Sequence, residues 1–431
     1  MSTTVEPAGT LSGRRGAETI GAPGVVLSSE QVRGFVAAQL AKVDLDGRTV
    51  CVLVPDATRS CPLPLLMGAV HGALAGRARR VTTLVALGTH AAMSEEHLAT
   101  LLGYPAGDSE SVYPGMTILN HEWWKPETFV TLGTISADRI AELSGYRLHT
   151  PVDVRLNRAV VEHDVALVVG PVFPHEVVGF SGGNKYFFPG IAGQEIIDLS
   201  HWLGALITSA KMIGALGITP VRALINEAVS LIPTEKLALC VIPESGTGAL
   251  HAMSFGDTES AWTDAAGISA QTNIRYLREP VQRVLSVIPP KYDEIWTAAK
   301  GFYKLEPVVA DGGEVIIYAP HVTEIASTHP EIYEIGYHCR DYFVKQWDRF
   351  AKVHWGVLAH STHLRGAGTW DEHDGEHDRV TVTLATGIPE DVVRSVNLNY
   401  LDPAAVDLAA YEADPGTFYV PNAGETLYRL R

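Results

Sequence analysis

Short runs of β-branched and other apolar residues alternate along this chain with segments whose apolar residues recur at the helical period. A parallel pair of strands needs a long crossover connection, usually a helix, so this alternation predicts an α/β fold with mainly parallel sheets. The predicted strands are residues 49–54, 81–87, 165–170, 237–242, 284–288, 314–319, 355–360 and 380–385, and the clearest predicted helices are residues 30–43, 64–76 and 219–232.

The length of 431 residues allows two or three domains of ordinary size. Charged residues and three prolines gather within residues 277–294, which places a domain junction near residues 275–290. We therefore expect an N-terminal α/β domain over residues 25–280 and a C-terminal α/β domain over residues 285–431, with the active site in the cleft between them. Residues 1–24 lack the continuous apolar segment of a secretion signal and are predicted to form a disordered leader.

The composition argues against several classes of partner. The formal net charge is −16, and the sequence contains no stretch rich in lysine and arginine. We therefore expect neither a nucleic-acid nor a membrane partner. No apolar run of 18 residues is present, and the protein is predicted to be cytoplasmic. The four cysteines lack any CxxC spacing, which argues against a zinc ribbon, an iron–sulfur site or a disulfide framework, and reduced thiols are expected.

Three predicted strands are followed directly by polar side chains. Asp56 and Arg59 follow the first strand, His90 follows the second, and His175 follows the strand 165–170. Ligand sites of open α/β sheets lie outside the carboxyl ends of the strands, so we expect these side chains at one rim. The segment EIWTA, also interpreted as the end of a strand, would deliver Lys300 from the second domain.

The densest signal is the glycine-rich run that contains Ser181, Gly182, Gly183 and Lys185. Its backbone suits the close approach of a ligand or an anion. It is not a P-loop, because Asn184 and Tyr186 stand where that motif needs glycine and serine or threonine. A helix is predicted after Pro189-Gly190, and it carries His201. Taken singly, such a turn and such a histidine are more often structural than functional.

Together these features resemble the nickel-pincer lactate racemase family. The run GFSGGNK, with His175 ten residues before its lysine and His201 sixteen residues after it, carries most of the resemblance. The segment DATR at 56–59 is similar to the D-x-T-R of that family, and GTH at 88–90 to its G-T-H. The stretch 298–313, with Lys300 eleven residues before Asp311, is similar to the second-domain lysine and D-G-G stretch. The resemblance extends from about residue 25 to at least residue 345.

The resemblance implies a cofactor, the nickel-pincer nucleotide (pyridinium-3,5-bisthiocarboxylic acid mononucleotide nickel), and hence proteins that synthesise it. By matching position, Lys185 would form a covalent thioamide with one arm of the cofactor, and His201 would be the protein's ligand to Ni. Ser181, Gly182, Gly183 and Asp56 would contact the cofactor. Apolar neighbours of Lys185 would favour the uncharged, nucleophilic amine, and imidazole is a suitable nickel ligand. A phosphate-contacting role for Lys185 is the plainer alternative.

The resemblance also implies the reaction, which is inversion of a small-molecule 2-hydroxy acid at C2 by reversible transfer of hydride to the pyridinium ring. Each direction needs a base for the hydroxyl proton, and His90 and His175 are the candidates. Arg59 and Lys300 would hold the substrate carboxylate. Asp56 would orient Arg59 or contact the cofactor.

Lactate racemases tend to carry Tyr-Gln before the second-domain lysine, whereas this chain has Trp296 and Thr297 there. These two residues are expected to contact the substrate. Its second half is rich in histidines without metal-site spacing, for which surface or polar-pocket roles are expected: His321, His329, His338, His360, His363, His373 and His377. Such polar groups also suit a longer acid, such as an aldonate. Two alternatives stay open, namely a metal-dependent hydrolase or lyase that uses His90, His175 and His201, and a binding relative without the cofactor.

Overall fold

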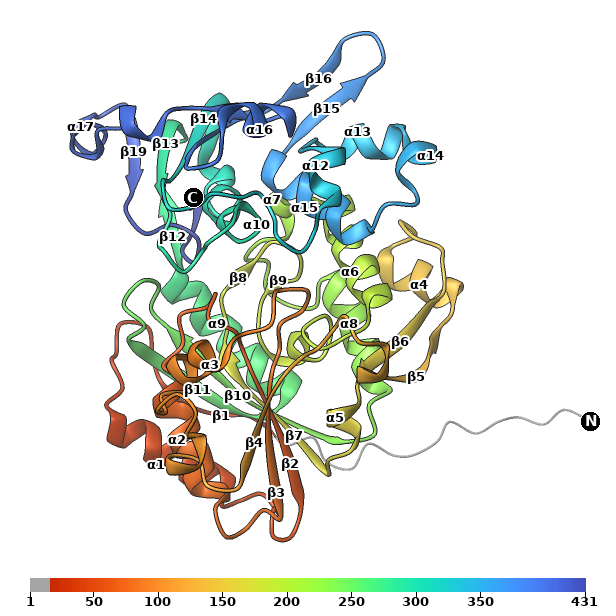
Figure 1. Ribbon diagram of the computed structural model, residues 1–431, viewed down its shortest axis with the longest axis vertical. Helices are drawn as coiled ribbons and strands as arrows, with labels where there is room; N and C mark the ends of the chain where they lie inside the picture. Colours follow the sequence, from red (N-terminus) through yellow and green to blue (C-terminus); the bar gives the residue numbers. More distant parts are fainter. Residues whose placement is uncertain (1–15) are drawn as a thin grey trace, which may run out of the picture.

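The computed structural model describes residues 16–431 and contains two regions built on separate sheets (Figure 1). The first sheet has the strand order β1-β11-β10-β7-β2-β3-β4, and its five strands from β10 to β4 are parallel. Its strands are β1 (Glu18–Gly21), β2 (Thr49–Val54), β3 (Arg80–Val85), β4 (Met116–Asn120), β7 (Val165–Pro171), β10 (Glu235–Pro243) and β11 (Leu250–Asp257).

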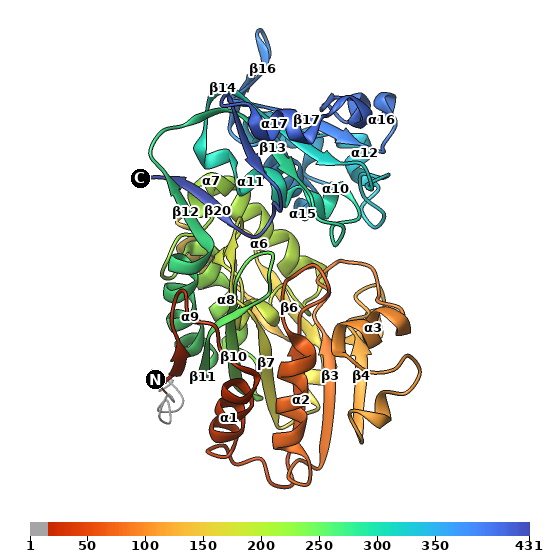
Figure 2. The ribbon, with the colours of Figure 1, turned by 90° about the vertical axis from the view of Figure 1, so that its left-hand side faces the viewer.

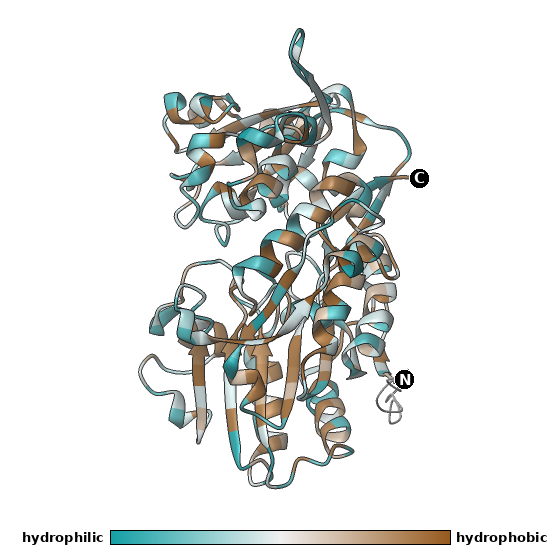
Figure 3. Ribbon diagram, turned by 90° about the vertical axis from the view of Figure 1, so that its right-hand side faces the viewer, coloured by the Kyte–Doolittle hydropathy of each residue, from teal (hydrophilic) through white to brown (hydrophobic). Residues whose placement is uncertain are grey.

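The central strands of this sheet are covered on both faces. Every residue of β2 is buried, and alternate side chains enter two different cores: Val50 and Val52 pack with α1 and α2, while Cys51 and Leu53 pack with α6 and α8. Strands covered on both faces consist of continuous apolar residues, as Figure 3 shows for this sheet. Figure 2 shows α1 and α2 over one face. The helices of this region are α1 (Ser29–Leu40), α2 (Leu63–Leu74), α3 (Glu95–Leu102), α4 (Ala137–Ser144), α5 (Arg158–Val161), α6 (Gln194–Ile207), α7 (Ser209–Met212), α8 (Pro220–Ser230) and α9 (Thr258–Asn273).

The second sheet has the order β18-β17-β14-β13-β19, and all of its pairs are parallel. The predicted class, α/β with mainly parallel sheets, is confirmed. These strands are β13 (Val281–Val287), β14 (Val309–Ala319), β17 (Val380–Thr386), β18 (Asn399–Tyr400) and β19 (Thr417–Val420). The helices of this region are α10 (Ile295–Ala298), α11 (Lys300–Tyr303), α12 (Glu331–Ile335), α13 (Arg340–Lys345), α14 (Trp347–Phe350), α15 (Trp355–Arg365), α16 (Glu390–Ser395) and α17 (Leu408–Ala413).

Smaller strand pairs complete the structure. The chain leaves the first region through β12 (Ile274–Leu277), and its last strand, β20 (Leu427–Leu430), returns to pair with β12 in parallel. The first sheet thus ends before the predicted junction, and the second begins within it. The other pairs are β5 (Phe129–Ile135) with β6 (Val152–Asn157), β8 (Pro174–His175) with β9 (Gly179–Phe180), and β15 (Gly368–Asp371) with β16 (Gly375–Asp378).

Three sequence-based predictions need correction. Residues 355–360 begin α15 and form no strand. The helical period is not visible in the sequence, because eight consecutive residues of that helix, from Val357 to Leu364, are buried. EIWTA is likewise no strand, since it leads into α10 and Lys300 begins α11. The predicted leader is too long, because β1 pairs with β11, a contact distant in sequence. The rest of that prediction, residues 1–15, lies outside the described residues.

Within residues 16–431, no helix is both long enough and apolar enough to cross a membrane.

Candidate active site

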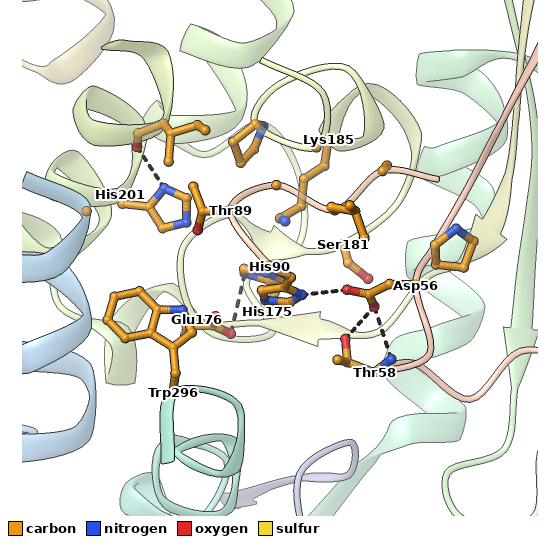
Figure 4. Close-up of a pocket in the computed structure, with 18 of the residues that line it drawn as sticks. Asp56, Thr58, Thr89, His90, His175, Glu176, Ser181, Lys185, His201 and Trp296 are labelled. Carbon is orange, nitrogen blue, oxygen red and sulfur yellow. Dashed lines mark hydrogen bonds and ion pairs between the residues drawn. The ribbon is translucent and has the colours of Figure 1, made fainter. Parts of the chain in front are cut away.

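The ends of three adjacent strands meet at one cavity. β7, β2 and β3 are neighbours in the sheet, and the segments that follow them carry His175, Asp56 and His90 into the same space. The cavity has a volume of about 190 Å³, and α11 and α15 of the second region close its other side. In Figure 4, Lys185 enters the cavity from the first region and Trp296 from a helix of the second. The predicted rim of polar side chains is therefore present, and it lies between the two regions.

Asp56 is the hydrogen-bond partner of His90. Its Oδ2 lies 2.5 Å from Nδ1 of His90, and its Oδ1 accepts hydrogen bonds from the backbone N (3.0 Å) and Oγ1 (2.6 Å) of Thr58. Burial by itself would raise the pKa of Asp56, but the charge of His90 and these hydrogen bonds outweigh it, so the pKa is lowered. An ionised Asp56 holds the His90 proton on Nδ1 and leaves Nε2 as a base. Asp56 therefore orients His90 and not Arg59, which it was predicted to orient.

His175 is buried and held in the opposite tautomer. Its Nδ1 accepts a hydrogen bond of 3.1 Å from the backbone N–H of Val177, which leaves the proton of the neutral ring on Nε2. Burial, followed by the positive charges of Lys185 and Arg59, places the pKa of His175 well below its ordinary value. The hydrogen bonds therefore direct the Nδ1 proton of His90 toward Asp56, whereas a neutral His175 carries its proton on Nε2.

Lys185 lies on the 3₁₀ turn Gly183–Tyr186, directly after the glycine pair. Its ammonium makes no hydrogen bond or ion pair with any described residue, which is unusual for a lysine inside a cavity. Burial, followed by the nearby charge of Arg59, lowers its pKa to about 8. An appreciable fraction of Lys185 is therefore an uncharged, nucleophilic amine near neutral pH.

His201 is prepared to bind a metal through one nitrogen. Its Nδ1 donates a hydrogen bond of 2.7 Å to the carbonyl oxygen of Ile197, one turn earlier in α6. Burial, followed by the charge of Lys185, lowers the pKa of His201, so the ring is neutral. Since Nδ1 holds the proton, Nε2 keeps its lone pair, as in most metal-ligating histidines.

The glycine-rich run plays two different parts. Ser181 and Gly182 line the cavity, and a Cβ on Gly182 would lie 2.6 Å from Cγ2 of Val172. The hydroxyl of Ser181 bonds to the backbone of Phe173 (2.9 Å), so it also fixes this loop. Gly183 does not line the cavity. The prediction that Gly183 contacts the cofactor therefore finds no support in its position, and packing explains this glycine instead.

Gly183→Ala is expected to destabilise the protein. Gly183 has a φ of +55°, and an added Cβ would lie 2.8 Å from Cβ of Trp262 and 3.0 Å from the carbonyl oxygen of Thr258. We expect the free energy of unfolding to fall by about 1–3 kcal/mol in urea denaturation. Gly267→Ala is the control, because it lies on the same helix as Trp262 with nothing within 4 Å of the new Cβ. Equal stability of the two variants would contradict the packing role.

The predicted carboxylate ligands, Arg59 and Lys300, both line the cavity. Among residues 16–431, the one hydrogen bond of the Arg59 guanidinium is a long one, 3.4 Å, to the carbonyl oxygen of Thr58, so its other donors are available. Lys300 lies over the ring of Tyr292, with Nζ 5.1 Å from the ring centre. Burial, then the charge of Arg59, lowers the pKa of Lys300 to about 7. The cavity thus offers a guanidinium and an amine to an anionic ligand although the whole chain is acidic.

Of the two predicted substrate contacts before Lys300, only Trp296 reaches the cavity. Its indole is stacked between His329 (3.9 Å between ring centres) and His360 (3.8 Å). Thr297 is buried, and its hydroxyl bonds to the carbonyl oxygen of Glu294 (3.1 Å). The prediction that Thr297 contacts substrate therefore needs correction, because helix α10 directs its side chain into this internal hydrogen bond.

Sequence reasoning missed two cavity residues, Glu176 and Tyr303. Glu176 directly follows His175, and that adjacency was the available signal. Tyr303 lies three residues after Lys300, which places both on one face only if the segment is helical. Among the many histidines of the second half, His329, His360 and His363 line the cavity, while His373 and His377 are exposed.

The histidines of the cavity do not form a metal site by themselves. Among residues 16–431, no group of three or more His, Cys, Asp or Glu side chains is arranged to hold a metal ion. A hydrolase that holds its metal with His90, His175 and His201 would need such a group. A metal carried mainly by a cofactor needs only the single free nitrogen that His201 offers.

Comparison with known proteins agrees with this arrangement. Residues 34–214 match the model of the lactate racemase N-terminal domain. The chain is 24% identical to the lactate racemase of Thermoanaerobacterium thermosaccharolyticum over 278 residues, which are 63% of this chain and 60% of that protein. A crystal structure of a protein from Thermotoga maritima superposes with a TM-score of 0.87 at 32% identity, covering 95% of this chain and all of the other.

The structure of the lactate racemase apoprotein from Thermoanaerobacterium thermosaccharolyticum superposes with a TM-score of 0.70 at 17% identity, covering 96% of this chain and all of that chain. This likeness shows that the two proteins share both regions of the fold. The match of residues 34–214 places this part of the chain in the lactate racemase family as its N-terminal domain.

Proposed function

We propose that this protein is a racemase or epimerase that inverts C2 of a 2-hydroxy acid, with a nickel-pincer nucleotide attached to Lys185. The observation that carries the proposal is the meeting of an unpartnered amine, Lys185, and a free imidazole nitrogen, His201 Nε2, in a cavity that also holds two histidines in opposite tautomers. The acid is either lactate-like or a longer polar acid such as an aldonate.

The residues of the cavity fit the cofactor. The amine of Lys185 suits a covalent tether, His201 suits a nickel ligand, and the backbone of Gly182 lines the same cavity. Asp56 and Ser181 line the same space. When bound, the cofactor supplies an acceptor for the hydride removed from C2 of the substrate.

The protein's own side chains bind the substrate and move its proton. Nε2 of His90, with its ring oriented by Asp56, takes the hydroxyl proton as the C2–H bond breaks. Nε2–H of His175 gives a proton to the oxygen when hydride returns to the opposite face. The other enantiomer would follow the same steps in reverse, starting with a proton on Nε2 of His90 and none on Nε2 of His175. The stacked Trp296 forms an apolar wall that excludes water from the reacting centre.

Arg59→Lys and Lys300→Ala are expected to weaken substrate binding. The substrate carboxylate needs cations at short range, because the overall charge of −16 repels it. We expect Lys300→Ala to raise KM on the order of 10-fold or more, and Arg59→Lys to raise it through the lost bidentate geometry although the charge is kept. Steady-state kinetics measures both values. Lys352→Ala, an exposed lysine outside the cavity, is the control, and an unchanged KM for Lys300→Ala would contradict the assignment.

The test of the function is to produce the chain together with cofactor-synthesis proteins, which are its proposed partners, in a reducing cytoplasm. The four unpaired cysteines fit that compartment. Intact mass should show an adduct on Lys185, and chiral chromatography should show conversion of a single 2-hydroxy acid enantiomer to the equilibrium mixture. An adduct without conversion of lactate or of an aldonate would refute the racemase. Conversion without any adduct would refute the cofactor.

A further inference from the structure

Both ring nitrogens of His363 are buried without a hydrogen-bond partner among the described residues. His363 lies on α15, is 4% exposed, and lines the cavity from the second region. None of the roles assigned above, whether tether, metal ligand, acid, base or carboxylate ligand, uses this side chain. A buried polar group without a partner costs free energy, so the ring is expected to be satisfied by a ligand that enters the cavity.

Glu176 also faces this part of the cavity and is not needed for the reaction. Its side chain is 13% exposed, and its Oε2 lies 3.4 Å from Nδ1 of His175. Burial raises its pKa, but the charges of Lys304 and His363 outweigh that effect, so the pKa is lowered and the carboxylate is ionised. His363 and Glu176 therefore lie within electrostatic range of each other, although no direct hydrogen bond joins them.

The protonation states of these two groups indicate the chemistry of the ligand. Burial lowers the pKa of His363 to about 4, so its neutral ring offers one donor and one acceptor. Glu176 offers only acceptors. A hydroxyl group can donate to Glu176 and also exchange a hydrogen bond with His363, whereas a methyl group satisfies neither. A second carboxylate on the ligand would be repelled by Glu176.

Tyr303 extends the same polar surface. It lines the cavity beside Glu176, and burial, followed by the charge of Glu176, places its pKa well above the ordinary value, so the phenol keeps its proton. Since Tyr303 and Lys300 both belong to α11, this polar surface begins next to the proposed carboxylate ligand. A ligand whose carboxylate binds Lys300 can therefore reach this polar surface with the carbon atoms beyond C2.

We propose that Glu176, Tyr303 and His363 bind hydroxyl groups beyond C2, and that the substrate is a polyhydroxylated monocarboxylic acid of the aldonate class. This inference rests on the proposed function for the position of the carboxylate and C2. It assigns Glu176 and His363 as specificity-determining residues.

The test compares acids of equal length in direct binding to the purified full chain. Isothermal titration calorimetry with D-gluconate and its C2 epimer, against 2-hydroxyhexanoate, isolates the contribution of the hydroxyl groups. For the unsubstituted protein we expect an aldonate to bind about 10-fold more tightly than 2-hydroxyhexanoate. Equal affinity, or tighter binding of 2-hydroxyhexanoate, would overturn the inference and indicate that the polar groups are satisfied by water.

Variants locate the effect. H363F keeps a planar aromatic ring but removes both nitrogens, and it should bring the affinity ratio close to one, whereas H363Q should retain part of the preference. H373F, which changes an exposed histidine, should leave the ratio unchanged. E176Q removes the negative charge, and it should improve binding of malate, a 2-hydroxy dicarboxylate, by about 10-fold. An unchanged ratio in H363F together with unchanged malate binding in E176Q would overturn the assignment.

The outcomes separate this inference from the proposed function. If the loaded enzyme inverts lactate while aldonates show no preferential binding, the racemase stands and the aldonate inference fails. If aldonates bind preferentially but no acid is inverted although Lys185 carries the adduct, the substrate class stands and the proposed reaction fails.

Discussion

Lys185→Ala is expected to abolish covalent retention of the cofactor and, with it, all conversion of 2-hydroxy acids. The reason is that Lys185 reaches the cavity at the glycine turn, has no hydrogen-bond or ion-pair partner in the described part of the chain, and has a pKa lowered to about 8 by burial and then by Arg59. The fold should persist, because this side chain contributes little to the hydrophobic core. Intact-mass spectrometry after production with the cofactor-synthesis proteins measures the adduct, and circular dichroism confirms folding.

Two further variants separate the tether from the metal ligand. Lys185→Arg keeps a positive charge but has no nucleophilic amine, so it should also lack the adduct. His201→Ala should keep the organic adduct and lose nickel, measured by elemental analysis, because separate residues make the covalent and coordination bonds. A folded Lys185→Ala protein that still carries the adduct would refute the tether, and loss of adduct and nickel together in His201→Ala would indicate a structural role for that histidine.

Loading should depend on pH in a direction set by Lys185. Only the uncharged amine attacks, and its fraction rises about tenfold per pH unit well below the pKa and levels off above it. With a pKa of about 8, the initial rate of adduct formation should increase about 10-fold from pH 6 to pH 7 and change little above pH 9. A rate that falls as the pH rises would exclude Lys185 as the nucleophile.

His90→Ala and His175→Ala are each expected to lower turnover about 10²-fold or more, the usual scale of general acid–base catalysis. Both directions of the reaction should be slowed by the same factor at equal saturation, because a substitution cannot change the equilibrium between the two enantiomers. Separate rates from each pure enantiomer, measured by chiral chromatography, test this expectation. Near-normal turnover in either variant would refute the two-base arrangement.

The two histidines should differ in their dependence on a neighbour. Asp56→Asn removes the ionised partner that fixes the tautomer of His90, so it should reproduce part of the His90→Ala loss with little change in KM. Val177 holds His175 through its backbone, so side-chain substitution there offers no equivalent test. His373→Ala, at an exposed site outside the cavity, is the control for both alanine variants and should keep full turnover.

The positions of the cavity residues in the first region could be predicted from the local sequence. β2, β3 and β7 are short apolar runs that are buried on both faces, and in a parallel sheet their carboxyl ends share one edge. Asp56, His90 and His175 follow those strands directly, so their convergence could be predicted without coordinates. The resemblance carried by GFSGGNK added the pairing of Lys185 with His201.

The second region shows where local sequence was insufficient. The histidines of α15 were not assigned to the cavity, because a helix buried on all sides has no polar face and its first residues read as a strand. Likewise, Thr297 turns inward and Trp296 turns toward the cavity only because α10 is a short helix. Such choices depend on which neighbours cover the segment.

The sequence by itself therefore determined the α/β class, the strand ends that carry Asp56, His90 and His175, and the resemblance to the lactate racemase family. Only the tertiary structure decided that Asp56 orients His90, that His175 has the opposite tautomer, and that Glu176 and His363 line one cavity without a hydrogen bond between them. Strand period and turn chemistry are local properties of the chain, whereas tautomers, pKa shifts and unsatisfied polar atoms arise from contacts between residues far apart in sequence.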